Sequence, residues 1–175
     1  GVASVRDDLG QLLWHVGAKN AYEEATSQFE QSLALRRELG DERAVARCLT
    51  RLGHMDLSRG NWGDAEDRYR AALSIRKKNG DIRGQAISMN GIANLFFERM
   101  EYKKATQIWQ EVERLARSIG DQGILAIGLI NLARAYLIQN DLERAEKNLE
   151  LAESMTDAAL NIRIYTQGQR VGSDQ

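Results

Sequence analysis

The sequence predicts an all-α protein, a right-handed superhelical solenoid built from antiparallel helix pairs. The dipeptide Gly-Asp recurs every 40 residues, at Gly40-Asp41, Gly80-Asp81 and Gly120-Asp121. A fixed spacing of this length is typical of stacked repeats, in which each unit buries its apolar face against its neighbours. The 175 residues include no proline, the residue that helix interiors tolerate least. We therefore expect helices along nearly the whole chain.

Aligning the chain at this period predicts two helices in each unit, with units of about 1–40, 41–80, 81–120 and 121–160. In the first helix, two columns of mainly large apolar residues lie three positions apart: Leu9, Leu49, Met89, Leu129, and Leu12, Leu52, Ile92, Leu132. In the second helix, an alanine is followed four positions later by a large residue: Ala25 and Phe29, Ala65 and Tyr69, Ala105 and Trp109, Ala145 and Leu149. Such spacings mark one face of a helix, and small residues mark a close approach between helices. Each unit is therefore expected to be a helix pair.

The residues between these stretches predict where the helices end. Asn20, Gly60, Met100 and Asn140 fall between paired helices, and all except Met100 tolerate the left-handed conformation that ends a helix. Asn61 and Asp141 are expected N-caps of the following helix. Between units, glycine closes one helix and aspartate opens the next. Residues 161–175 start in register with the earlier units and then become rich in glycine, which indicates a truncated fifth repeat or a frayed capping tail.

These columns resemble the tetratricopeptide repeat over about residues 6–157. In the second unit, the family pattern of a large residue, Leu-Gly, alanine, an aromatic residue and alanine is met by Leu49, Leu52-Gly53, Ala65, Tyr69 and Ala72. The units have 40 residues instead of the usual 34, and the closing proline is replaced by Arg37, Lys77, Arg117 and Asp157. This longer variety resembles the repeats of Pins-type spindle adaptors and of bacterial regulatory proteins. The resemblance implies a concave groove, lined by the first helix of each pair, that binds protein segments.

The composition gives no support for a nucleic-acid or membrane partner. The formal net charge is −1, so no large basic field exists to attract a phosphate backbone. No apolar run is long enough to cross a bilayer. The single cysteine, Cys48, cannot form an internal disulfide, which fits a reducing compartment and predicts a cytoplasmic protein.

Neither a catalytic site nor a metal or cofactor site is expected. The sequence contains no phosphate loop, no dinucleotide fingerprint, no His-Glu-x-x-His and no Gly-x-Ser-x-Gly motif. The two histidines, His15 and His54, lack a second ligand at metal-binding spacing. We therefore predict that this protein is not an enzyme and uses no cofactor.

The resemblance places eight residues of the first helices in the groove as contacts for a partner: Arg47, Arg51, His54, Asn90, Asn94, Phe97, Asn131 and Arg134. The groove is then basic in the second unit, rich in amides in the third and apolar towards the fourth, which suits a bound peptide or helix. Structural roles are the alternatives. The two arginines of the second unit can clamp a carboxylate or pair with neighbouring acids. The asparagines can hydrogen-bond between units, and the histidine and phenylalanine can pack between helices.

One specific function of the family can be tested by register. Some tetratricopeptide domains hold the C-terminal carboxylate of chaperones with lysine, asparagine and arginine side chains from three repeats. Asn94 and Asn131 match the asparagines, but Asn90 stands where the first lysine belongs, and Gln167 and Val171 occupy the last basic positions. A chaperone clamp is therefore not expected.

The sequence predicts a protein–protein interaction module that binds a peptide or helical segment in its concave groove, as the scaffold or sensor part of a larger regulatory protein. Two alternatives stay open. Copies of the chain can self-assemble into an end-to-end or dimeric scaffold, which makes it a possible homo-oligomer. The segment can also restrain another domain of its own parent chain.

Overall fold

The protein is an arc of antiparallel helix pairs. The computed structural model describes residues 1–16 and 21–155, and no strand occurs in these residues. They form α1 (Val2–Val16), α2 (Ala21–Glu38), α3 (Glu42–Ser58), α4 (Trp62–Lys78), α5 (Ile82–Glu98), α6 (Tyr102–Ile119), α7 (Gln122–Ile138) and an eighth helix over 142–155. The all-helical fold that the sequence predicts is confirmed. The expected fifth repeat or capping tail, residues 161–175, lies outside the described residues, as does the predicted turn at Asn20.

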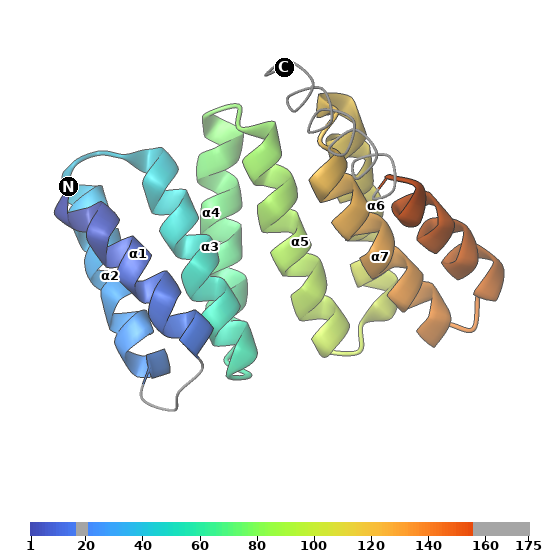
Figure 1. Cartoon of the computed structure of the whole chain (residues 1–175), viewed down its shortest axis with the longest axis horizontal. Coiled ribbons are helices and arrows are strands. Elements are labelled where there is room, and N and C mark those ends of the chain that lie inside the picture. Colours follow the sequence, from blue (N-terminus) through green and yellow to red (C-terminus); the bar gives the residue numbers. More distant parts are fainter. Residues whose placement is uncertain (17–20, 156–175) are drawn as a thin grey trace, which may run out of the picture.

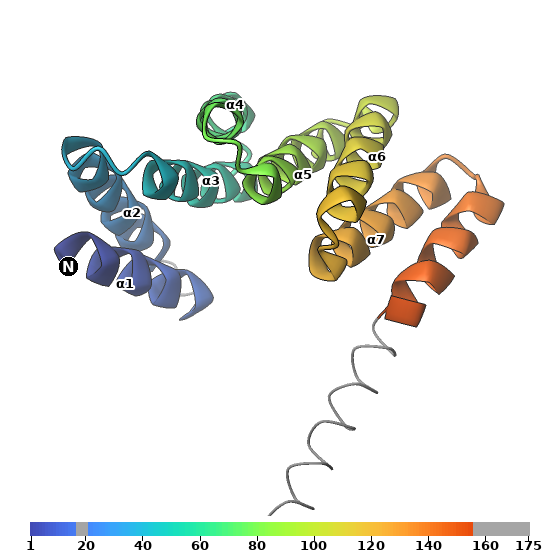
Figure 2. The same cartoon turned by 90° about the horizontal axis from the view of Figure 1, so that it is seen from above.

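The helices stack in the order of the chain. α1 packs on α2, α3 on α4 and α5 on α6, and contacts between α2 and α3, α4 and α5, and α6 and α7 join one pair to the next (Figure 1). Figure 2 shows the arc from above, with α4 and α6 on its outer side. The odd-numbered helices, here called the first helices, lie on the inner side, where α3 contacts α5 and α5 contacts α7.

The joints between pairs share one geometry. Gly40, Gly80 and Gly120 have φ angles of +67°, +64° and +68°, the left-handed conformation in which glycine has no steric cost. The side chain of the aspartate that follows each glycine accepts a hydrogen bond from the backbone N–H three residues on, at 2.8–3.0 Å. The predicted stop and start signals are therefore confirmed at these joints.

The turns inside the pairs use the left-handed conformation as well. Gly60, Met100 and Asn140 have φ angles of +77°, +61° and +59°, so Met100 adopts the same turn as its glycine and asparagine equivalents. Two backbone hydrogen bonds hold this turn, from Met100 N–H to the Phe97 carbonyl at 2.9 Å and from Glu101 N–H to the Phe96 carbonyl at 2.8 Å. Its side chain is 75% exposed, which spares it a packing conflict. Asn61 occupies the predicted N-cap position of α4, but its side chain makes no capping bond.

The predicted small-residue column is buried. Ala25, Ala65, Ala105 and Ala145 are at most 1% exposed, and the bulky residues one turn later, Phe29, Tyr69 and Trp109, are fully buried. Each aromatic ring fills the space between its own pair and the next first helix. Leu149, the fourth member of that column, is 38% exposed.

The large-residue columns are not buried to the same extent in every unit. Leu49 and Leu52 of α3 are buried because α2 packs against that face. Leu9 and Leu12 of α1 are 40% and 66% exposed, because no second helix precedes α1 among the described residues. A column is therefore buried only where a neighbouring pair lies against it.

Cys48 packs between helices. Its thiol is fully buried, and the Sγ lies 3.4 Å from an Asp7 carboxylate oxygen and 3.6 Å from the Ser32 hydroxyl. Burial raises the pKa of this thiol above its ordinary value, which disfavours the reactive thiolate. Among the described residues, no helix is long and apolar enough to span a membrane.

Candidate functional site

The inner face of the arc collects residues from α3, α5 and α7. Helices that curve into an arc approach most closely on its inner side, and the direct contacts of α3 with α5 and of α5 with α7 place these first helices there. All eight residues that the sequence predicts as partner contacts belong to these three helices. Some of these residues form two clusters, and others make hydrogen bonds or ion pairs with side chains of the fold.

The first cluster is a pair of asparagines on neighbouring helices. The Asn90 Oδ1 accepts hydrogen bonds from Trp109 Nε1 at 2.9 Å and from Asn131 Nδ2 at 3.0 Å. An indole nitrogen only donates, so this contact fixes which end of the Asn90 amide is the oxygen. The Asn90 Nδ2 and the Asn131 Oδ1 then stay unbonded within the described residues, and neither is a buried unpaired atom. The pair therefore presents one donor and one acceptor in a fixed orientation.

The second cluster is a stack of rings under a guanidinium. The Phe97 ring centroid lies 5.2 Å from that of Tyr102 and 5.6 Å from that of Trp109. The guanidinium carbon of Arg134 lies 4.2 Å from the Phe97 centroid and 6.0 Å from the Trp109 centroid. The faces of these rings attract the Arg134 guanidinium and restrict its motion. Arg134 is exposed and pairs with no carboxylate of the described residues.

Asn94 lies one helical turn before Phe97 on α5. Its side chain is half-buried and makes no hydrogen bond within the described part of the chain. Trp109 connects the two clusters, because it donates to Asn90 and packs on Phe97. The groove columns do not predict this role of Trp109 in joining the two clusters, because Trp109 belongs to the second helix of its pair. The sequence indicates only that Trp109 is a large residue in a column expected to pack between helices.

The two arginines of α3 are in different situations. Arg51 forms an ion pair with the buried Asp7 at 3.3 Å and donates to Gln11 Oε1 at 3.1 Å. Asp7 also pairs with Arg36 at 2.7 Å, so Arg51 belongs to a network that joins the first two pairs. Arg47, one turn earlier, is exposed and has no partner among the described residues. A joint clamp by both arginines would require Arg51 to leave Asp7.

His54 is held by the aromatic column beneath it. Its Nδ1 shares a hydrogen bond of 2.8 Å with the Tyr69 hydroxyl, and the two rings meet edge-on at 5.3 Å. Burial lowers the pKa of His54 below its ordinary value, and the nearby Arg76 charge lowers it further. The neutral form of His54 is therefore favoured in the fold, where its ring packs against Tyr69.

Arg76 is a buried cation that the sequence did not single out. Its Nη1 donates to Thr50 Oγ1, the Gly84 carbonyl and Ser88 Oγ at 3.0, 3.0 and 2.6 Å, and all three acceptors are neutral. Its nearest carboxylate oxygen, on Asp81, is 4.0 Å from Nε. Burial lowers the pKa of this guanidinium, and the charge of Arg47 lowers it as well. Positive charge is thus only partly compensated where α3 meets α5.

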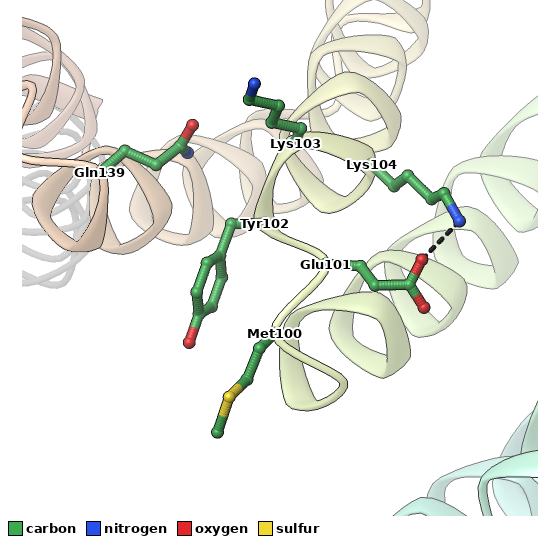
Figure 3. Close-up of a pocket in the computed structure, with 6 residues that line it drawn as sticks. All are labelled: Met100, Glu101, Tyr102, Lys103, Lys104 and Gln139. Atoms are coloured by element: carbon green, nitrogen blue, oxygen red, sulfur yellow. Dashed lines mark hydrogen bonds and ion pairs between the residues drawn. The ribbon is translucent and has the colours of Figure 1, made fainter.

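A pocket of about 450 Å³ lies at the turn between α5 and α6 and shares Tyr102 with the second cluster. Its lining comes from Met100, Glu101, Tyr102, Lys103, Lys104 and Gln139. In Figure 3, Met100 and Tyr102 point to the same side, while Lys104 turns away to its ion pair with Glu101. Gln139 approaches from the end of α7 and is bonded to Thr106 Oγ1.

No cluster of three or more His, Cys, Asp or Glu side chains that could hold a metal ion occurs within residues 1–16 and 21–155. The chemistry of the inner face is instead that of amides, guanidinium groups and apolar side chains. These groups bind peptide backbone, carboxylates and aliphatic side chains.

Comparison with known proteins bears on the fold. A sequence model of the tetratricopeptide repeat matches residues 1–78 and 84–158. The chain resembles BtubC (BKLC) from P. vanneervenii with 21% identity and a TM-score of 0.76, over 91% of this chain and 64% of that one. It resembles aspartyl phosphate phosphatase F from Bacillus subtilis with 9% identity and a TM-score of 0.82, over 90% and 40% of the two chains. A Rap protein complexed with competence and sporulation factor is similar at 15% identity and a TM-score of 0.75, over 87% and 42%.

No curated protein sequence matches the chain. The chain spans less than two thirds of the length of each of the three solved structures named above. Identities this low show a shared fold and no more. The two matched ranges of the family model cover most of the residues and contain all eight predicted contacts. The chain therefore belongs to the tetratricopeptide repeat family.

Proposed function

We propose that this chain is a protein-interaction module that binds an extended peptide segment along its inner face, as the scaffold or sensor part of a larger regulatory protein. The observation that carries the proposal is the Asn90–Asn131 pair. Its free Nδ2 and Oδ1 offer one donor and one acceptor, which is what a peptide backbone needs from a side-chain amide pair. The bond from Trp109 holds this pair in place before a ligand arrives, which reduces the entropy cost of binding.

Further support comes from the residues around the pair. Asn94 adds an amide with no partner inside the described part of the chain, and Ile130 and Leu137 of α7 are each 50% exposed. A segment lying across α5 and α7 would find backbone partners and apolar contacts together. A solved structure with this fold, a Rap protein, is a complex with competence and sporulation factor, which supports a binding role for the fold. A cytoplasmic location is part of the proposal and is supported by the buried free thiol of Cys48.

The test is a selection of random 12-residue peptides displayed on phage, followed by binding measurements on the enriched peptides by fluorescence anisotropy. Asn94→Ala removes an amide that has no partner in the described residues, so the fold is expected to be unaffected and affinity to fall about fivefold. Gln31→Ala, an exposed amide of the outer helix α2, is the matched control and should leave affinity unchanged.

Asn131→Ala should weaken binding as well, with circular dichroism used to check that helicity is kept. Enriched peptides that bind all three variants as tightly as the wild type would place the binding surface elsewhere and overturn the proposal. A selection that enriches no peptide at all would overturn it too.

A further inference from the structure

The inner face is positive in a chain whose total charge is −1. Of the eight residues predicted as partner contacts on α3, α5 and α7, three are arginines, Arg47, Arg51 and Arg134, and none is acidic. Arg51 is neutralised by Asp7 within the fold. Arg47 and Arg134 have no carboxylate partner among the described residues. Two guanidinium groups are therefore available to a ligand on this face.

The surroundings of Arg47 favour the binding of an anion there. Arg47 lies on α3 near the buried Arg76, whose hydrogen bonds go to neutral groups of Thr50, Gly84 and Ser88. The nearest carboxylate of the described residues, that of Asp81, lies 4.0 Å from Arg76 Nε and also accepts a hydrogen bond from the backbone N–H of Gly84. A ligand carboxylate at Arg47 would offset the charge of both arginines, and unlike the folded chain's own acids it can approach from the open side.

The environment of Arg134 adds selectivity. Its guanidinium is held over the Phe97 ring at 4.2 Å, which leaves its N–H edge free for a carboxylate. Ile130 and Leu137, four residues before it and three after it, lie on the same face of α7 and are half exposed. A carboxylate that binds here is flanked by aliphatic surface. This combination favours a protein segment over a bare anion.

We propose that the ligand of the inner face is an acidic segment with two carboxylates, one at Arg47 and one at Arg134, and with aliphatic residues beside the second. This inference rests on the proposed function. The two arginines are separated by two helix spacings of about 8–10 Å and by about 10 Å along the helix axis, or roughly 20 Å in all. An extended chain covers about 3.3 Å per residue, so the two acidic residues stand about six positions apart.

The same phage-displayed library of random 12-residue peptides tests this inference. We expect the enriched peptides to carry aspartate or glutamate about six positions apart, with leucine, isoleucine or valine beside one of them. Arg134→Gln and Arg47→Gln should each weaken binding about tenfold or more, the scale for a hydrogen bond to a charged group. Arg134→Lys keeps the charge but loses the planar stacking, so it should give a smaller loss.

The matched control is Arg37→Gln, an exposed arginine of α2 with no partner in the described residues, which should leave affinity unchanged. Enriched peptides without acidic residues, or acidic peptides whose affinity is the same for Arg134→Gln, Arg47→Gln and Arg37→Gln, would overturn the inference. If those peptides still lose affinity on Asn94→Ala, the proposed function stands without it. If they do not, both fail.

Discussion

The ring of Tyr69 is wedged between two glycines on neighbouring first helices, and this contact predicts an unusual response to mutation. A Cβ added at Gly91 of α5 would lie 2.5 Å from the Tyr69 Cε1, and one added at Gly53 of α3 would lie 2.8 Å from the same atom. Tyr69 is fully buried and its hydroxyl is bonded to His54, so the ring cannot rotate away freely. We predict that Gly91→Ala destabilises the protein, although alanine is the better helix former.

The magnitude follows from two opposing effects. Forcing an extra methyl group into a packed core costs about 1–3 kcal/mol. Replacing glycine by alanine inside a helix gains about 0.5–1 kcal/mol. The expected net loss is therefore about 0–2.5 kcal/mol with a centre near 1 kcal/mol, and each kcal/mol lowers Tm by roughly 2–4 °C for a chain of this size.

Gly128→Ala in α7 is the matched control. A Cβ at Gly128 would meet its nearest atom, Val112 Cγ1, at 3.7 Å, an ordinary van der Waals contact. This substitution should therefore stabilise the protein by about 0.5–1 kcal/mol, opposite in sign to Gly91→Ala.

Urea and thermal unfolding followed by circular dichroism measure both substitutions, in the wild type and in a Tyr69→Ala background. Removing the ring should abolish the penalty, so that Gly91→Ala becomes stabilising there; this coupling isolates the Tyr69 contact. If Gly91→Ala and Gly128→Ala change the free energy of unfolding equally in the wild type, the prediction is wrong, and the Tyr69 ring does not limit how closely α3 and α5 approach.

Two further predictions concern pH. Asp121→Ala should cost about 1 kcal/mol by removing the cap of α7. The hydrogen bond from the Ile124 backbone N–H lowers the pKa of Asp121, and Arg83 lowers it further. The contribution of Asp121 to the free energy of unfolding is therefore complete above the ordinary carboxyl pKa and is lost as pH falls through the lower pKa of the folded state. The variant should therefore lose less stability than the wild type between about pH 5 and about pH 2, measured by urea unfolding. Burial lowers the pKa of His54, which favours its neutral form in the fold, so stability falls as pH drops below the ordinary histidine pKa towards the folded value. His54→Gln, compared at about pH 7.5 and about pH 5.5, should reduce that loss; an unchanged loss would contradict the assignment.

The sequence was a good guide to the joints and to the small-residue columns, because both are decided locally. Each of the three Gly-Asp dipeptides of this chain ends one helix and caps the next, and the alanine column permits close packing in every unit. Met100 shows the limit of residue preferences. Two backbone hydrogen bonds of the turn hold its positive φ without the help of glycine.

The site was only partly predictable, because its chemistry depends on which neighbours reach each side chain. Arg47 and Arg51 look equivalent in the sequence, yet only Arg51 meets Asp7, which comes from a different helix pair. The exposure of Leu9 and Leu12 likewise depends on whether a pair precedes theirs, which no residue-level pattern encodes. The eight predicted contacts stay a prediction until a ligand is measured.

The uniform joints have a consequence for engineering and for gene duplication. Because Gly40, Gly80 and Gly120 share one backbone conformation, the connection itself sets no limit on inserting or exchanging a unit at those points. The limit lies in the side chains at the seam. A second copy of residues 81–120 placed after Gly120 would bring Ala116, instead of Arg76, against the new copies of Gly84 and Ser88, and would leave the volume of a guanidinium unfilled. An added unit would therefore need a bulkier residue at position 116. Lengthening this array can reuse the same Gly-Asp connection, but the side chains where two units meet must be matched to each other.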